Sequence, residues 1–288
     1  MGGVCCYQWR VILLSCAMCT TGALQMSDGD YLLFKNKDFG RMNFDDRIVL
    51  SQDIFGIRGT TSWADNDLEG DQFSGFSIGA NKHGLFCADS NVREEPANGN
   101  NYDVLTEIAL VEGSDVVTAV AALEQALTAE SYWCANLMLV DSSTVAVVEI
   151  KGSELHCSFE PGLATRTNHH VYFGATATDD DVVTSADRLD WSYRRLSKAT
   201  GLPDVLELQR SHDGGQTGIC NHSSYETVYS YVLIRTKEGM TLSVTQGHPC
   251  GDGLTRDLLL PLGGSWSREA AEKFRAAFPS TDGSSGLC

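Results

Sequence analysis

Short apolar runs alternate with turn-forming residues through the first hundred residues. The segment 27–30 (SDGD) separates two apolar runs, which predicts strand, tight turn, strand. The segment 81–84 (NKHG) is a second turn of this kind between apolar runs. The strands predicted here cover residues 20–26, 31–34, 48–57, 73–80 and 85–89. The first part of the chain is therefore predicted to be mainly antiparallel sheet.

Two helical patterns follow, over residues 102–111 and 116–128. In the second, Val116, Val120 and Leu123 recur at the spacing of one helix face. Ser114 and Asp115 come directly before it and are typical of a helix start.

The second half of the chain repeats this order of strands and helices. Strands are predicted at 135–140, 145–151, 228–235 and 240–246, with helices at 184–196 and 203–209. Ser185 is interpreted as a residue at the start of the first of these helices. Strands, helices, strands, helices and strands in this order predict two packed sheets with helices outside them.

Composition indicates a globular protein with a single large domain. The chain has 288 residues, of which 42% are hydrophobic and 20% charged, enough for one well-covered core. Its formal charge of −17 repels phosphate backbones and anionic membranes, so nucleic acid is not an expected partner. The oligomeric state is left open, and a homo-oligomer is compatible with the sequence.

The first 18 residues differ from the rest of the chain. Arg10 and the apolar run at 11–17 faintly resemble a signal peptide, and the run is too short to span a membrane. We expect residues 1–18 to be a leader removed from, or not translated in, the mature form, residues 19–278 to form one catalytic domain, and residues 279–288 to be a disordered tail. A cytoplasmic location is expected, with secretion as the alternative.

The ten cysteines are scattered and form no compact disulfide framework. Cys87 and Cys134 lie inside apolar runs and are interpreted as buried thiols. No paired CxxC motif is present, so a structural zinc site has little support from spacing, and no metal is expected.

Cys19 differs from the other cysteines because it follows the leader and directly precedes a predicted strand. A cysteine attacks as its thiolate and needs a nearby base. If Cys19 becomes the first residue, its own α-amino group, with an ordinary pKa near 8, can serve as that base. Either cleavage before Cys19 or a translation start at Met18 followed by methionine removal would give this terminus.

The segments around Cys19 closely resemble a known family. Residues 19–21 (CTT), the following hairpin and residues 35–38 (KNKD) are similar to the start of the isopenicillin N acyltransferase-like and choloylglycine hydrolase families. The resemblance implies the four-layer αββα N-terminal-nucleophile fold, an α+β class. It also implies that Asp38 is a carboxylate near the α-amino group and that Lys35 and Thr20 line the substrate site.

Further motifs extend the resemblance along the chain. Residues 81–85 (NKHGL) with Asn91 look like a family hairpin, and residues 165–170 (TRTNHH) and 185–188 (SADR) match later elements. The resemblance implies that Asn91 and Asn168 donate to an oxyanion and that Arg188 approaches the nucleophile and pairs with Asp38. His169 is assigned to the substrate pocket.

The match continues through a pattern of histidines and cysteines. It comprises residues 212–213 (HD), 218–222 (GICNH), 227–228 (TV) and 247–250 (GHPC), so the resemblance spans Cys19 to about Cys250. Such residues also allow a metal or redox protein built on His212, Cys220, His222 and other thiols.

The leading hypothesis is an autoactivated cysteine amidohydrolase acting on a linear amide of a small acylated amine. An acyltransferase is the alternative if an amine resolves the thioester, and a catalytically silent binding protein is another if Cys19 stays blocked. No coenzyme A phosphate-binding motif is evident, and no cofactor is expected. Specificity is expected from pocket loops, with Trp63 as a candidate substrate contact in the segment 60–75.

Overall fold

The structure is a computed structural model that describes residues 18–39, 45–50, 53–60, 75–93, 99–175, 180–223, 225–251, 254–260 and 276. The expected leader before Met18, the expected tail after residue 278 and the segment containing Trp63 lie outside these residues. None of the described helices has both the length and the apolar character needed to cross a membrane.

In the described part of the chain, thirteen strands form two sheets, and every pairing between these strands is antiparallel. The six-stranded sheet has the order β10 (Leu163–Arg166), β1 (Cys19–Gln25), β2 (Tyr31–Phe39), β11 (Glu226–Arg235), β12 (Met240–Gln246) and β13 (Leu254–Leu260). The seven-stranded sheet has the order β3 (Asp45–Leu50), β4 (Ile54–Thr60), β5 (Ile78–Asn81), β6 (Phe86–Asn91), β7 (Tyr132–Val140), β8 (Val145–Gly152) and β9 (Glu154–Glu160).

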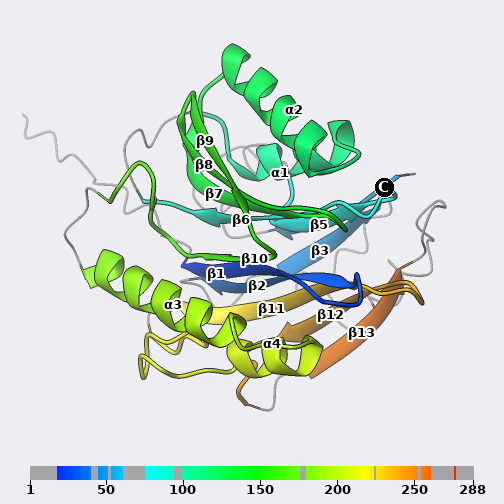
Figure 1. Cartoon of the computed structure of the whole chain (residues 1–288). Coiled ribbons are helices and arrows are strands. Elements are labelled where there is room, and N and C mark those ends of the chain that lie inside the picture. The colour runs from blue at the N-terminus through cyan, green and yellow to red at the C-terminus, as the bar shows by residue number, and fades with distance from the viewer. Residues whose placement is uncertain are drawn as a thin grey trace, which may run out of the picture.

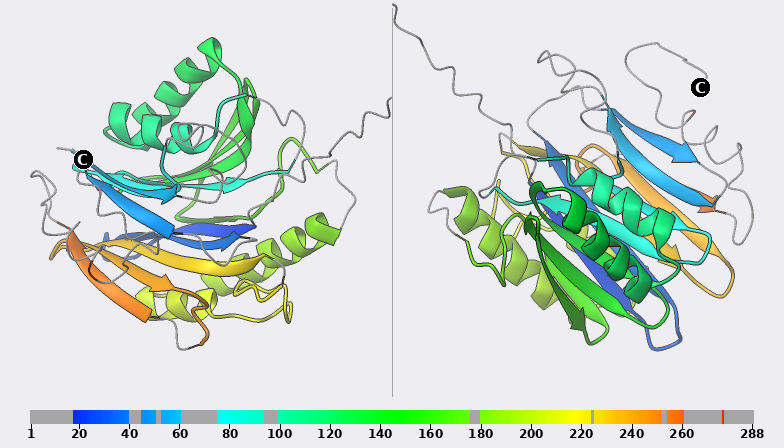
Figure 2. Two further views of the ribbon diagram at one scale, coloured as in Figure 1. Left: turned by 180° about the vertical axis from the view of Figure 1, so that it is seen from behind. Right: turned by 90° about the horizontal axis from the view of Figure 1, so that it is seen from above.

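Helices cover the outer face of each sheet, as Figures 1 and 2 show. Helices α1 (Asp103–Glu112) and α2 (Val116–Ala129) pack on the seven-stranded sheet, and α3 (Asp180–Leu196) and α4 (Leu202–Gln209) lie against the six-stranded sheet. The arrangement is the predicted αββα sandwich.

Among the described residues, three apolar clusters lie between the four layers. The central cluster, which includes Leu33, Phe86 and Tyr231, lies between the two sheets, and one further cluster lies beneath each pair of helices. In β2, Leu33 packs into the central cluster whereas Leu32 and Phe34 face the α3–α4 side. Because both faces of β2 are covered, all nine of its residues are buried, which explains its unbroken apolar start.

The predicted helices and hairpins agree well with the structure. The turn at 27–30 joins β1 to β2 with Gln25 opposite Tyr31. Helix α2 begins at Val116 with Asp115 as its N-cap, and the side chains of Asp115 and Thr118 form a reciprocal capping box. Both helices of the first half thus begin within one residue of the predicted position.

Two strand predictions were wrong in extent. Residues 48–57 do not form one strand but parts of the hairpin β3–β4, in which Leu50 pairs with Phe55. The polar segment 51–53 (SQD) interrupts the apolar run at the reversal, and the single predicted strand ran through it. The strand predicted at 73–80 is confined, within the described residues, to β5.

The start of α3 also differs from the prediction. The helix already includes Asp180, so Ser185 lies inside it and does not cap it. The Ser185 hydroxyl instead accepts a hydrogen bond from the main-chain N–H of Asn168, at 2.8 Å. A serine whose local sequence predicts a helix cap therefore makes a tertiary contact instead.

Candidate active site

Cys19 is the first residue of β1, the strand between β10 and β2 in the six-stranded sheet, and 3% of its surface is exposed. Its main-chain N–H donates to Oδ1 of Asn168 at 2.8 Å. The carbonyl of Met18, on the other side of the same peptide bond, accepts from the main-chain N–H of Asp38 at 2.7 Å. The N–H and the carbonyl of the Met18–Cys19 peptide thus both form hydrogen bonds to residues that were predicted to belong to the site.

Arg188 reaches Cys19 from α3 and is completely buried. Its Nη1 donates to the carbonyl of Cys19 at 2.8 Å and to Oγ1 of Thr20 at 3.1 Å. Its Nη2 donates to Oδ1 of Asn168 at 2.9 Å. One guanidinium therefore fixes the start of β1 and the loop after β10 together.

Asp38, near the end of β2, is a fully buried carboxyl group. Thr227 donates its hydroxyl to Oδ1 at 2.6 Å, and Asn221 donates Nδ2 to Oδ2 at 3.3 Å. Burial raises the pKa of Asp38 to about 7, although the Arg188 charge and the hydrogen bonds from Thr227 and Asn221 act in the opposite direction. The carboxyl group therefore changes charge near neutral pH.

Asp38 is predicted to pair with Arg188. The Arg188 charge lowers the pKa of Asp38, so the two groups interact electrostatically. The guanidinium hydrogen bonds described above go to Cys19, Thr20 and Asn168. Arg188 thus stabilises the Asp38 carboxylate while it orients the residues around Cys19.

Asn168 connects Cys19 to Asn91. Its Oδ1 faces the Cys19 nitrogen, and its Nδ2 donates to the main-chain carbonyl of Asn91 at 2.8 Å. In this arrangement the amide holds the nitrogen of Cys19, the atom that would become the α-amine. The roles of Asn91 and Asn168 as oxyanion donors stay predictions.

Lys35 lies on β2 as a buried cation beside the thiol. Its Nζ donates to Oδ1 of Asp89 at 2.8 Å and to the carbonyl of Ser77 at 3.0 Å. Burial acts to lower the pKa of Lys35, but the charges of Asp89, Cys19 and Asp103 and the hydrogen bond to Asp89 together outweigh it, so the net shift is upward. The ammonium is thus engaged in an ion pair, and its role in substrate binding stays a prediction.

The Cys19 thiol is kept neutral by its surroundings. Burial raises its pKa, while the Lys35 charge lowers it and the charges of Asp38 and Asp89 raise it. A thiol in this position needs a base to become a nucleophile, as the sequence hypothesis assumes.

The remaining predicted contacts border this cluster. Thr20 is completely buried and accepts from Arg188, and His169 lies next to Asn168 with its Nδ1 2.8 Å from Oγ of Ser185. Burial, together with the Arg188 charge, lowers the pKa of His169, which favours its neutral imidazole. Trp63 lies outside the described residues.

Several residues of the site were not assigned from the sequence. Thr227 and Asn221 hold Asp38, Asp89 pairs with Lys35, and Ser185 supports Asn168. Thr227, Asn221 and Ser185 lie inside motifs of the family resemblance, and Asp89 lies two residues before Asn91. Their side-chain partners are 17 to 189 residues away in the chain, so local spacing carried no signal for these contacts.

Known proteins resemble this chain in structure, not in sequence. No protein family and no curated protein matches the sequence. Among solved structures, a mutant of the conjugated bile acid hydrolase from Clostridium perfringens superimposes with a TM-score of 0.50 at 14% identity, over 85% of this chain and 97% of that one. The N-acylethanolamine-hydrolyzing acid amidase ortholog from Caenorhabditis elegans gives a TM-score of 0.48 at 12% identity, over 74% and 92% of the two chains.

The chain has the N-terminal-nucleophile hydrolase fold. The bile acid hydrolase belongs to that superfamily, and its four-layer sandwich is the architecture found here. The fold expected from the resemblance is therefore confirmed.

Proposed function

We propose that this chain is an autoactivated cysteine amidohydrolase that cleaves a linear, non-peptide or small peptide-like amide through a thioester on Cys19. The observation that carries the proposal is the environment of the Met18–Cys19 peptide. Its nitrogen faces Asn168 and its carbonyl faces the Asp38 N–H, at the first residue of a buried strand. The hydrolase activity named for the bile acid hydrolase of similar architecture is compatible with it.

Maturation follows from the contacts of that peptide. The Cys19 thiol attacks the Met18 carbonyl carbon, and the Asp38 N–H, 2.7 Å from the carbonyl oxygen, stabilises the negative charge that develops there. The C–N bond then breaks, the nitrogen takes up a proton as the new α-amine, and the acyl group remains on sulfur. Water hydrolyses this thioester, which releases residues 1–18 with a carboxylate and frees the thiol.

Catalysis reuses the same atoms. The free α-amine of Cys19 accepts the thiol proton, while Asn168 holds this nitrogen through Oδ1. The thiolate attacks the substrate carbonyl, the protonated amine returns its proton to the leaving amine, and water resolves the thioester. Asp38, with a pKa raised by burial to about 7, and the cation of Arg188 set the charge around that amine.

The proposed substrates are small acylated amines such as N-acyl amino acids, β-alanyl conjugates or short peptide-like amides. Lys35, Thr20, Trp63 and His169 are the proposed substrate-side residues. An amine that takes the place of water would turn the same thioester chemistry into acyl transfer. Hydrolysis is preferred over acyl transfer because water is always available at such a site.

The test compares wild type with Cys19→Ala and Cys19→Ser on a panel of acylated amines. We expect both variants to lose processing of residues 1–18, and Cys19→Ala to lose turnover by at least about 10³-fold, as for removal of other nucleophiles. Cys157→Ser is the matched control, because Cys157 lies on the outer strand β9.

Turnover by Cys19→Ala equal to that of wild type would remove the proposed nucleophile. Tight binding of an acylated amine by an unprocessed wild-type chain, with no product released, would instead identify the silent binding protein. The two results separate the failure of one residue from the failure of the whole function.

A further inference from the structure

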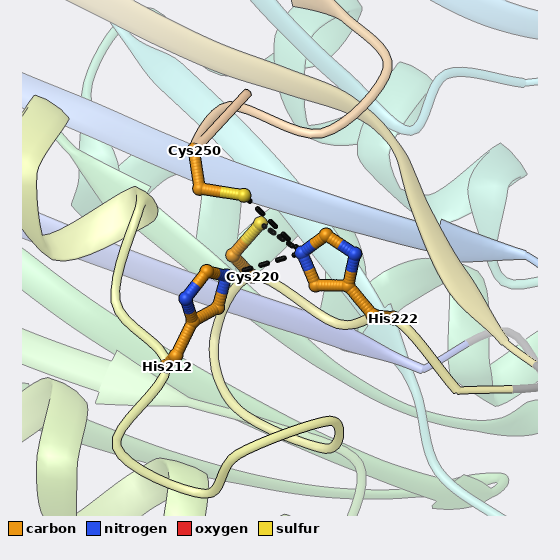
Figure 3. A group of neighbouring side chains, drawn as sticks. All are labelled: His212, Cys220, His222 and Cys250. Atoms are coloured by element: carbon orange, nitrogen blue, oxygen red, sulfur yellow. Dashed lines mark hydrogen bonds between the residues drawn. The ribbon is translucent and has the colours of Figure 1, made fainter.

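Two histidines and two cysteines form a cluster outside the residues assigned to amide chemistry. His212, Cys220, His222 and Cys250 each place one ligand atom within 4.8 Å of the others. Figure 3 shows the four side chains converging from two separate loops, with the sulfur atoms and ring nitrogens directed inward. Cys220 is buried and His212 is exposed, so the cluster extends from the core to the surface.

The distances centre on Nε2 of His222. This atom lies 3.1 Å from Nε2 of His212, 3.5 Å from Sγ of Cys220 and 3.2 Å from Sγ of Cys250. A ring nitrogen carries either one hydrogen or one lone pair, so it makes one good hydrogen bond. Hydrogen bonding therefore explains one of these three contacts and leaves the other two unexplained.

We propose that these four residues bind a zinc ion. With Zn–N near 2.0–2.1 Å and Zn–S near 2.3 Å, a tetrahedron has edges of about 3.3 Å between nitrogens and about 3.6 Å between nitrogen and sulfur. The three distances around His222 lie within a few tenths of an ångström of these edges. Two imidazoles and two thiolates are a donor set that zinc prefers, and the thiolates cancel its charge.

The backbone brings the ligands together without help from a regular element. Three ligands lie on the loop between α4 and β11, and Cys250 lies on the loop between β12 and β13. Gly247, at φ 81°, makes the turn that leads to Cys250, and its N–H donates to the carbonyl of Val228 at 2.8 Å. The ion would thus clamp two loops at one end of the six-stranded sheet.

A fifth residue orients the central ligand. The ring of His248 stacks on that of His222 with centroids 3.9 Å apart and an interplanar angle of 22°. Nε2 of His248 lies 3.3 Å from Oε2 of Glu226, so a carboxylate lies next to the stacking ring. Support of a ligand ring by an outer layer of this kind is common in metal sites.

The clamp adjoins the candidate active site through one residue. Asn221 lies between the ligands Cys220 and His222 and donates Nδ2 to Asp38 at 3.3 Å. Its main-chain N–H donates to Oγ1 of Thr227, which in turn donates to Asp38. A zinc ion on the flanking residues would fix both donors to the Asp38 carboxyl group.

Metal analysis of the full chain, purified under reducing conditions, tests the site. We expect one zinc ion per chain in wild type and its loss in Cys220→Ser and Cys250→Ser. Cys157→Ser and His156→Gln are matched controls outside the cluster and should keep the ion. Cobalt taken up in place of zinc should give the absorption of a tetrahedral, thiolate-bound ion.

His212→Gln guards against a variant that fails to fold, because His212 is exposed. Chelator competition should show zinc affinity reduced by more than about 100-fold, since losing a ligand exceeds the cost of losing an outer-layer partner. In the same variant we expect amide hydrogens of residues 211–223 to exchange at least tenfold faster when free zinc is limiting.

Wild-type protein that takes up no zinc, or zinc content unchanged in the ligand variants, would overturn the site. A mass two hydrogens below the reduced chain, mapped to a Cys220–Cys250 disulfide that persists in reductant, would do the same. Unchanged hydrogen exchange despite loss of zinc would overturn the clamp.

Discussion

At the scale of single residues, the guanidinium of Arg188 connects three parts of the candidate site. It donates to the carbonyl of Cys19, the hydroxyl of Thr20 and the amide oxygen of Asn168, and its charge acts on Asp38. Because the group is completely buried, water cannot replace it as a donor. Its removal takes one donor away from each of three acceptors at once.

Arg188→Met should therefore be severely destabilising. We expect the free energy of unfolding to fall by about 3–5 kcal/mol, the usual cost of removing one partner from a buried charged network. Urea denaturation measures this. Arg194→Met is the control on the same helix, because Arg194 pairs with Asp190 at the surface and its loss should change stability by less than about 0.5 kcal/mol. Equal effects of the two substitutions would contradict the role given to Arg188.

Asp38 predicts a specific dependence of stability on pH. Its pKa is about 7 in the folded chain, above the ordinary value of 3.8, so between these values the folded state binds more protons than the unfolded state. Stability contributed by this group is full below about pH 4, falls as the pH rises to about 7, and is constant above that.

Asp38→Asn should remove this fall in stability. Measured in the Cys19→Ala background, so that chain processing is the same, unfolding free energies from pH 4 to 8 should decline more steeply with an aspartate at position 38. The difference should be a few kcal/mol across the window. Parallel pH profiles for the two chains would show that Asp38 is ionised in the folded state throughout.

The candidate site was predicted unevenly from the sequence. Cys19, Asp38, Asn168 and Arg188 were recognised by motif order, and the structure brings them together. Thr227 was not assigned because its bond to Asp38 spans 189 residues and depends on the packing of β11 beside β2. Contacts of that kind are set by tertiary structure, not by local pattern.

At the scale of elements, β2 is joined to the opposite sheet by buried ion pairs. Lys35 pairs with Asp89 of β6 at 2.8 Å, and Lys37 pairs with Asp46 of β3 at 2.7 Å. A strand within an apolar sandwich that carries two lysines has to present them to carboxylates, because an unpaired buried charge is costly. These pairs place the end of β2, and so Asp38, against the seven-stranded sheet.

Lys35→Met should cost about 3–5 kcal/mol because it leaves Asp89 buried without its cation. Adding Asp89→Asn should recover part of that loss, since the uncompensated charge is then gone. Thermal or urea unfolding of the two single variants and the double variant measures the coupling. Lys82→Met, from the exposed pair with Asp53, is the control and should cost at most about 1 kcal/mol. Additive losses would contradict the pairing.

Elements with one clear pattern were predicted well, and those at sheet edges were not. Helix α2 has an apolar face and a capping box, and its predicted bounds are close to the observed ones. Strand β9 is mostly half-buried, and the side chains of Ser158 and Glu160 are hydrogen-bonded to each other. Its sequence shows little alternation of apolar and polar residues, so it was not predicted. Strand β13, with Arg256 and Asp257 at its centre, was missed for the same lack of pattern.

At the scale of the whole molecule, the candidate site belongs to no single layer. Cys19 and Asp38 come from the six-stranded sheet, Asp89 from the seven-stranded sheet and Arg188 from a covering helix. The site therefore exists only when the layers are packed together, and we expect it to form and be lost with the complete fold. The αββα order could be predicted because strands and helices alternate in blocks, whereas the way the layers meet at Cys19 could not.

The central claim is that one residue supplies both nucleophile and base, which requires Cys19 to be the first residue of the active chain. Its most direct test is the intact mass of active protein, measured before and after rapid quenching with an acylated amine substrate. The account predicts a chain that begins at Cys19 and gains the mass of one acyl group on that residue. A fully active chain that retains Met18, or an acyl group found on another residue, would contradict it.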